Sequence, residues 1–124
     1  MVNQKVAVLM LKKLGYQADA VTDGAAAVAA LENKPYNLIL MDMHMPKMDG
    51  LTATRLIRQQ WPANEQPVII ALTASTLQED QQQCIEAGMN DYLSKPLRLE
   101  DLVNKLKLWQ DSDFGSRIQL NQPT

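Results

Sequence analysis

Two nearly uninterrupted apolar runs stand out along the chain, and each is followed by a polar residue. The run at 37–41 leads into Asp42 and then into a stretch rich in Met, Pro and Gly, while the run at 67–72 leads into Thr73. Apolar runs of this length, without polar alternation, are typical of strands buried on both faces of a parallel sheet. The pattern therefore predicts two central strands at these positions.

The rest of the pattern alternates between helical and strand-like spacing. Apolar residues three or four positions apart predict helices over 2–14, 24–33, 51–60, 76–87 and 99–109. Short strands are predicted at 16–21 and 91–94, and the first helix has one rival interpretation, a strand through 6–11. Asp49 suits the cap of the third helix, and Gly88 suits the end of the fourth. Strands that alternate with helices favour an α/β fold whose parallel sheet is covered by helices on both faces.

The composition is that of one ordinary globular domain. The chain has 124 residues, of which 46% are hydrophobic and 21% are charged, and its formal net charge is -2. This balance gives no electrostatic reason to expect nucleic-acid binding or contact with an anionic membrane. No apolar stretch reaches the ~20 residues that span a bilayer. The single cysteine, Cys84, excludes an internal disulfide and a cysteine zinc site, and it fits a buried thiol in a cytoplasmic protein.

Three chemically useful side chains fall at the carboxyl ends of predicted strands. They are Asp42, Thr73 and Lys95. Open α/β sheets bind ligands at this edge, where all parallel strands end. An aspartate there can attack a phosphoryl group and form an acyl phosphate, while an ammonium group and a hydroxyl neutralise charge and donate hydrogen bonds.

Three motifs in the same regions make the chain resemble a known family. They are MDMHMPKMDG at 41–50, ALTA at 71–74 and AGMNDYLSKP at 87–96. Through them, residues 2–109 resemble a response-regulator receiver domain, most closely the receiver modules of hybrid sensor histidine kinases. The resemblance implies a flavodoxin-like three-layer sandwich with a parallel sheet in the strand order 2-1-3-4-5. We expect the receiver domain over 1–110 and a C-terminal tail over 111–124.

The resemblance also implies a role for each site residue. Asp42 would accept a phosphoryl group from phosphohistidine, Thr73 would be the switch hydroxyl, and Lys95 would contact the phosphoryl group. Tyr92 would be the aromatic switch, and Mg²⁺ would bind Asp42 and the backbone carbonyl of His44. The partner would be a histidine kinase or a histidine phosphotransfer domain. The chain would then be a phosphorelay switch, part of a hybrid histidine kinase, and not a metabolic enzyme.

The sequence departs from the family at its amino end. The family has a first strand, before its first helix, that ends on two acidic residues, and these hold Mg²⁺ together with the phospho-acceptor. Here the chain opens on residues typical of the first helix, and the earliest acidic residue is Asp19. We therefore expect Mg²⁺ binding, and with it phosphoryl transfer, to be weak or lost.

Three explanations of the missing strand stay open. The simplest is that the sequence begins inside a receiver domain. In the second, residues 117–120, which alternate polar and apolar, fill the gap or swap between two copies in a homodimer. In the third, the chain is a degenerate receiver that only binds partner proteins. A hydrolase with an aspartyl-phosphate intermediate is disfavoured, because His44 stands where such enzymes place a second Asp.

Overall fold

The computed structural model describes residues 4–21, 24–33, 36–43, 48–62, 66–73, 78–94, 98–109 and 117–121. Helices and strands alternate along these residues. In chain order they are α1 (Gln4–Lys13), β1 (Gln17–Val21), α2 (Gly24–Asn33), β2 (Leu38–Asp42), α3 (Gly50–Gln60), β3 (Val68–Thr73), α4 (Gln78–Ala87), β4 (Asp91–Ser94), α5 (Leu99–Trp109) and β5 (Arg117–Asn121).

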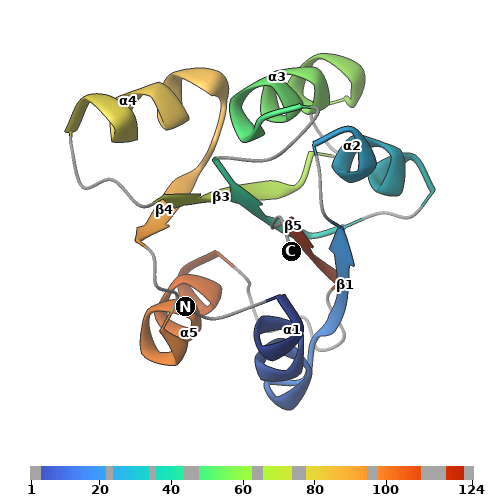
Figure 1. Cartoon of the computed structure of the whole chain (residues 1–124), viewed down its shortest axis with the longest axis vertical. Helices are drawn as coiled ribbons and strands as arrows, with labels where there is room; N and C mark the ends of the chain where they lie inside the picture. The colour runs from blue at the N-terminus through green and yellow to red at the C-terminus, as the bar shows by residue number, and fades with distance from the viewer. Residues whose placement is uncertain are drawn as a thin grey trace.

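The strands form one five-stranded sheet in the order β1-β5-β2-β3-β4, and every neighbouring pair is parallel. Helices α2, α3 and α4 lie on one side of this sheet, and α1 and α5 lie on the other (Figure 1). The predicted α/β sandwich with a parallel sheet is therefore confirmed, and the rival strand through 6–11 is wrong because those residues belong to α1.

The hydrophobic core is divided by the sheet, and β2 contributes to both halves. All five residues of β2 are buried. Ile39 and Met41 pack into the cluster formed with α2, α3 and α4, whereas Leu38 and Leu40 pack into the cluster that contains Leu102 of α5. This two-sided burial explains why the segment reads as an uninterrupted apolar run, since neither face of the strand meets water.

The centre of the sheet is complete, although the sequence lacks the first strand of the family. The place between β1 and β2, where the family order puts its first strand, is occupied by β5, which comes last in the sequence (Figure 1). Ile118 is in register with Ala18 on one side and with Leu38 on the other. Residues 117–121 of the expected tail are thus a central strand, as the second of the three explanations requires.

The connection to β5 obeys the handedness of parallel sheets. The chain moves from β1 to β2, β3 and β4 in one direction along the sheet, and the helices of those three connections cover one face. It returns from β4 to β5 in the opposite direction, and α5 covers the other face. Reversing both the direction and the face keeps the same hand, so the carboxyl-terminal strand can enter the centre without a disfavoured crossover.

Candidate functional site

Asp42 and Thr73 lie at the carboxyl edge of the sheet, on neighbouring strands. Asp42 is the last residue of β2, and only 2% of its surface is exposed. It is in register with Leu72 of β3, and Thr73, which is also buried, follows at once. The predicted convergence of a carboxylate and a hydroxyl at this edge is therefore present. The apolar pattern predicted strands that end one residue earlier, at 41 and 72. In the structure, Asp42 and Thr73 are themselves the last residues of β2 and β3.

Two backbone hydrogen bonds fix Met43 and Met48, which lie on either side of residues 44–47. The backbone N–H of Met43 donates to the carbonyl of Leu72, and that of Gly24 donates to the carbonyl of Met48, both at 3.1 Å. A Cβ at Gly50 would collide with the carbonyl oxygen of Asp42. The first turns of α2 and α3 therefore lie close to this edge, and helix N-termini favour negative charge through their dipoles.

Asp49 caps α3, as the sequence predicted. Its carboxylate accepts a hydrogen bond of 2.8 Å from the backbone N–H of Thr52. This hydrogen bond is the main cause that lowers the pKa of Asp49 below its ordinary value. The side chain of Asp49 is therefore committed to the helix terminus, which agrees with a structural role.

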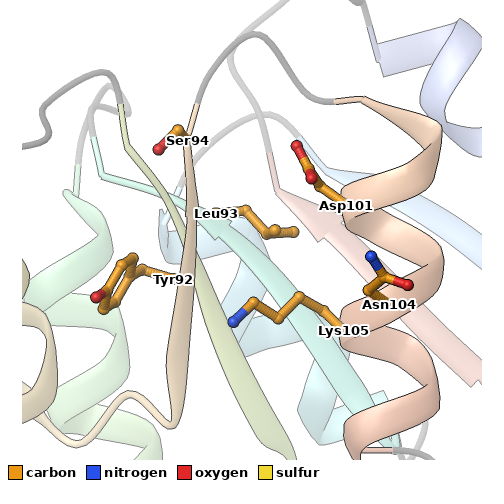
Figure 2. A pocket seen from close by; sticks show the side chains of 6 residues that line it. All are labelled: Tyr92, Leu93, Ser94, Asp101, Asn104 and Lys105. Carbon is orange, nitrogen blue, oxygen red and sulfur yellow. The ribbon is translucent and has the colours of Figure 1, made fainter.

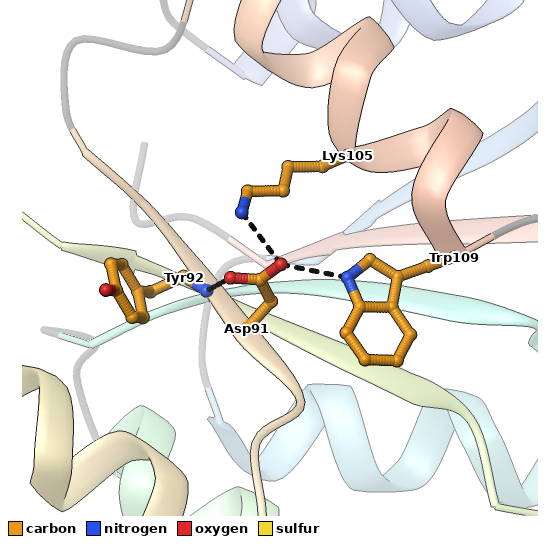
Figure 3. A network of polar contacts seen from close by, with 4 residues as sticks. All are labelled: Asp91, Tyr92, Lys105 and Trp109. Atoms are coloured by element: carbon orange, nitrogen blue, oxygen red, sulfur yellow. Dashed lines mark hydrogen bonds and ion pairs between the residues drawn. The ribbon is translucent and has the colours of Figure 1, made fainter.

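Tyr92 lies on β4, beside a small polar network. The Asp91 carboxylate accepts hydrogen bonds from Nζ of Lys105 at 2.8 Å, from Nε1 of Trp109 at 2.9 Å and from the backbone N–H of Tyr92 at 2.8 Å (Figure 3). Lys105 Nζ also lies 6.0 Å from the centroid of the Tyr92 ring. Nothing in the sequence pattern signalled this network, because its members are spread over two elements.

A pocket of about 400 Å³ opens between β4 and α5. In Figure 2, Leu93 points from β4 toward α5, whereas Tyr92 points to the other side of the strand. The remaining lining residues are Ser94, Asp101, Asn104 and Lys105. Since β4 is an edge strand, this pocket lies next to an edge that a partner protein can reach.

Two of the predicted site residues, Lys95 and His44, lie outside the described residues. Lys95 directly follows Ser94, which ends β4 and is in register with Thr73. Cys84 is buried as expected, and its thiol donates to Sδ of Met43 at 3.6 Å.

Asp42 supplies a buried carboxylate at this edge. Across the described ranges, no group of three or more His, Cys, Asp or Glu side chains could hold a metal ion. Mg²⁺ prefers six oxygen ligands and is usually held by one or two carboxylates together with water. In the same part of the chain, no helix has the length and apolar character needed to cross a membrane.

A parallel α/β sandwich with a buried aspartate beside a threonine at its carboxyl edge defines a class of proteins that bind ligands at this edge. The comparisons with known proteins identify the family within this class. The family model described as the response regulator receiver domain matches residues 1–107. The chain therefore belongs to the response regulator receiver domain family.

Similar chains come from hybrid signalling proteins. The hybrid signal transduction protein dokA of Dictyostelium discoideum is 41% identical over 112 residues, or 90% of this chain. Hybrid signal transduction histidine kinase H of the same organism is 43% identical over 111 residues, or 86% of this chain. The chain spans only 6% and 8% of the lengths of these two relatives.

Two solved structures extend the comparison. The receiver domain of sensor histidine kinase PA1611 from Pseudomonas aeruginosa PAO1, with magnesium coordinated in its active site cleft, is 47% identical with a TM-score of 0.77. That alignment covers 86% of this chain and 87% of the other. The Saccharomyces cerevisiae Ssk1 receiver domain, solved with the phosphotransfer protein Ypd1, is 29% identical with a TM-score of 0.79, over 90% of this chain and 86% of the other.

Proposed function

We propose that the chain is the phospho-acceptor receiver module of a phosphorelay, and that Asp42 accepts the phosphoryl group. The observation that carries this proposal is the burial of Asp42 at the carboxyl edge beside Thr73, in a member of the receiver family. A carboxylate oxygen of Asp42 attacks phosphorus as the bond to the imidazole nitrogen of a phosphohistidine breaks, and the imidazole keeps the bonding electrons.

The neighbouring residues take complementary roles in this proposal. Thr73 donates its hydroxyl to a phosphoryl oxygen, and Lys95 neutralises part of the added charge. Tyr92 then reports the change to the surface formed by α4, β4 and α5, which includes the pocket in Figure 2. Phosphorylation shifts the population of two arrangements of this surface, and partner proteins distinguish between them.

The proposed donor is a histidine phosphotransfer domain or a histidine kinase in the cytoplasm. Two neighbours support this choice, because one is a receiver domain of a sensor histidine kinase and the other was solved with the phosphotransfer protein Ypd1. We further propose that the chain works as part of a hybrid histidine kinase, and the similarity to hybrid signal transduction histidine kinase H supports this proposal.

Magnesium binding is proposed to be weak in this chain. Asp42 and the backbone carbonyl of His44 would contribute oxygen ligands, and the bound ion would offset negative charge at the edge. The lack of a larger acidic group among the described residues supports this proposal.

The test is incubation with acetyl phosphate and MgCl₂, read by intact mass spectrometry. We expect the chain to gain the mass of one phosphoryl group slowly, and Asp42→Asn to gain none. Equal labelling of the Asp42→Asn variant, or no labelling of the original chain at any Mg²⁺ concentration, would contradict the proposal.

A second candidate function is a protein-interaction module that works without phosphorylation. The lack of an acidic metal site among the described residues favours this candidate. It predicts that a partner captured through the surface of α4, β4 and α5 binds the original chain and Asp42→Asn equally well, with or without acetyl phosphate. A phosphorylation-dependent change in affinity would exclude it.

We also propose that β5 can exchange between two copies to form a homodimer. The proposal is supported by the pairing of β5 with β1 and β2, because the β5 strand of a second copy offers the same backbone partners. Sedimentation velocity over a wide range of concentrations tests it. A monomer at every concentration would contradict the exchange.

A further inference from the structure

Strand β4 forms one edge of the sheet, because it is the last strand in the order and follows β3 there. An edge strand turns alternate backbone N–H and C=O groups outward, and another chain can pair with them. The hydrogen bonds of β3 show which residues of β4 do so. The N–H of Val68 donates to the residue before β2, and the carbonyl of Leu72 accepts from the residue after β2. The backbone groups of these two residues of β3 therefore point toward β2.

The alternation along the strands places the N–H of Tyr92 on the open edge. Neighbouring residues of a strand direct their backbone groups to opposite sides, so Ala71, one residue before Leu72, directs its groups toward β4. In a parallel ladder, one residue of each registered pair bonds across the ladder and the other turns away. Ala71 is in register with Tyr92. The N–H of Tyr92 therefore faces outward, and so does that of Ser94 two positions later.

The outward N–H of Tyr92 is already occupied by a side chain. It donates to Oδ1 of Asp91 at 2.8 Å (Figure 3). The other oxygen of this carboxylate, Oδ2, accepts from Nζ of Lys105 and from Nε1 of Trp109, so two donors of α5 hold it in place. The carbonyl oxygen of an added strand would need to lie about 2.9 Å from the same nitrogen. Oδ1 of Asp91 therefore takes the place of a neighbouring strand.

We propose that the Asp91 carboxylate, held by Lys105 and Trp109, closes the open edge of β4 to pairing with the β4 strand of a second copy. A second copy fits this edge because two identical edges, related by a two-fold axis, offer each other the same outward groups. In such a pair, a carbonyl oxygen of the second copy needs the place where Oδ1 of Asp91 lies. The inference does not depend on phosphoryl transfer to Asp42.

The experiment compares variants of the full chain by sedimentation velocity over a wide range of concentrations. We expect Asp91→Ala to form dimers at concentrations at least about tenfold lower than the original chain does, because the variant no longer has the competing hydrogen bond to a charged group. Glu100→Ala is the matched control, since Glu100 is exposed on α5 and the change removes the same charge. The control should sediment as the original chain does.

A double variant tests whether the new contact uses the edge of β4. Proline at Ser94 removes the other outward N–H, and an edge strand tolerates proline where its N–H faces away from the sheet. In Asp91→Ala combined with Ser94→Pro, the added association should disappear, whereas an exchange of β5 would be unaffected. The proposal is overturned if a folded Asp91→Ala associates no more than the original chain, if Glu100→Ala associates as much, or if the double variant still does.

A measurement on the original chain keeps the proposal testable if Asp91→Ala does not fold. Native-state hydrogen exchange by NMR compares the two outward amides of β4. The amide of Tyr92 should have a protection factor at least about tenfold higher than that of Ser94, because only the amide of Tyr92 donates to the carboxylate. Equal protection of the two amides would overturn the closure of this edge by Asp91.

Discussion

At the scale of single residues, Asp91 joins β4 to α5 through the hydrogen bonds in Figure 3. Burial alone would raise the pKa of its carboxyl group. The hydrogen bonds from Lys105, from Trp109 and from the backbone N–H of Tyr92 outweigh that effect and hold the pKa below its ordinary value. Lys105 and Asp91 are also partly shielded from water, with 29% and 14% of their side-chain surfaces exposed.

We predict that Asp91→Asn lowers the free energy of unfolding by about 1–2 kcal/mol at pH 7, since hydrogen bonds to a charged group are the stronger ones. The pKa of Asp91 is lower in the folded chain than in the unfolded chain. Its contribution is therefore complete above the unfolded value of about 4 and is lost as the pH falls through the folded value. Urea unfolding at pH 7 and at successively lower pH measures both effects.

The control for this prediction is Asp101→Asn, an exposed position on α5, the helix that carries Lys105 and Trp109. It should change the unfolding free energy by less than about 0.5 kcal/mol, as surface substitutions usually do. A difference between the original chain and Asp91→Asn that stays constant down to the lowest pH would contradict the ionic origin of the effect.

Gly50 is a second residue whose importance depends on close packing. Alanine is normally better than glycine within a helix by about 1 kcal/mol. Here the added Cβ would meet the backbone oxygen of Asp42, which cannot move without disturbing β2. We predict that Gly50→Ala lowers the unfolding free energy by about 1–3 kcal/mol, the cost of an overpacked contact. Thermal unfolding measures this loss, and Gln59→Ala, on the exposed face of α3, should have little effect.

At the scale of elements, Arg58 shows how loops far from the candidate site are fixed. Its guanidinium group donates to the carbonyl of Gly88 at 2.7 Å, to the carbonyl of Pro67 at 2.9 Å and to the side chain of Asn90 at 2.8 Å. The end of α3 is thereby tied to the segments that lead into β3 and β4. Gly88 has φ +108°, which explains why glycine ends α4.

Strand β5 lies in a region that was expected to be a C-terminal tail. Both of its edges pair with neighbouring strands, so its backbone amides should be protected from solvent. We predict that the amides of Ile118 and Leu120 exchange hydrogen as slowly as that of Leu40 in the buried strand β2. Native-state hydrogen exchange by NMR measures this protection. Rapid exchange at both amides would mean that β5 does not remain in the sheet.

At the scale of the whole molecule, the sheet depends on a strand from the far end of the chain. β1 pairs with the rest of the sheet through β5, because β5 separates β1 from β2 in the strand order. A break in β5 should therefore expose β1 and α1 together with the core beneath them. The two ends of the chain are expected to unfold as one cooperative unit.

We predict that Leu120→Pro lowers the unfolding free energy by about 3 kcal/mol or more, because proline cannot donate a ladder hydrogen bond in a central strand. Since a small domain is stable by only ~5–15 kcal/mol, part of the population should unfold at room temperature. Circular dichroism during urea unfolding measures the loss. Leu120→Val keeps the backbone donor and should retain a cooperative transition, whereas equal stability of the proline variant would contradict a central position for β5.

The sequence by itself determined the elements from α1 to α5 and the edge at which Asp42 and Thr73 meet. Those features depend on local periodicity, on caps such as Asp49, and on the rule that parallel strands end at one edge. The three motifs at 41–50, 71–74 and 87–96 together indicated the family.

Only the tertiary structure decided which strand completes the sheet. Arg117–Asn121 is short, and its alternating pattern is compatible with an edge strand, a tail or a swapped element, because strand pairing is a long-range interaction that local periodicity does not encode. The last residue of β5, Asn121, is in register with Val21 on one side and with Met41 on the other. The register of β5 against β2 therefore follows from the assembled sheet and not from the local pattern of its own residues.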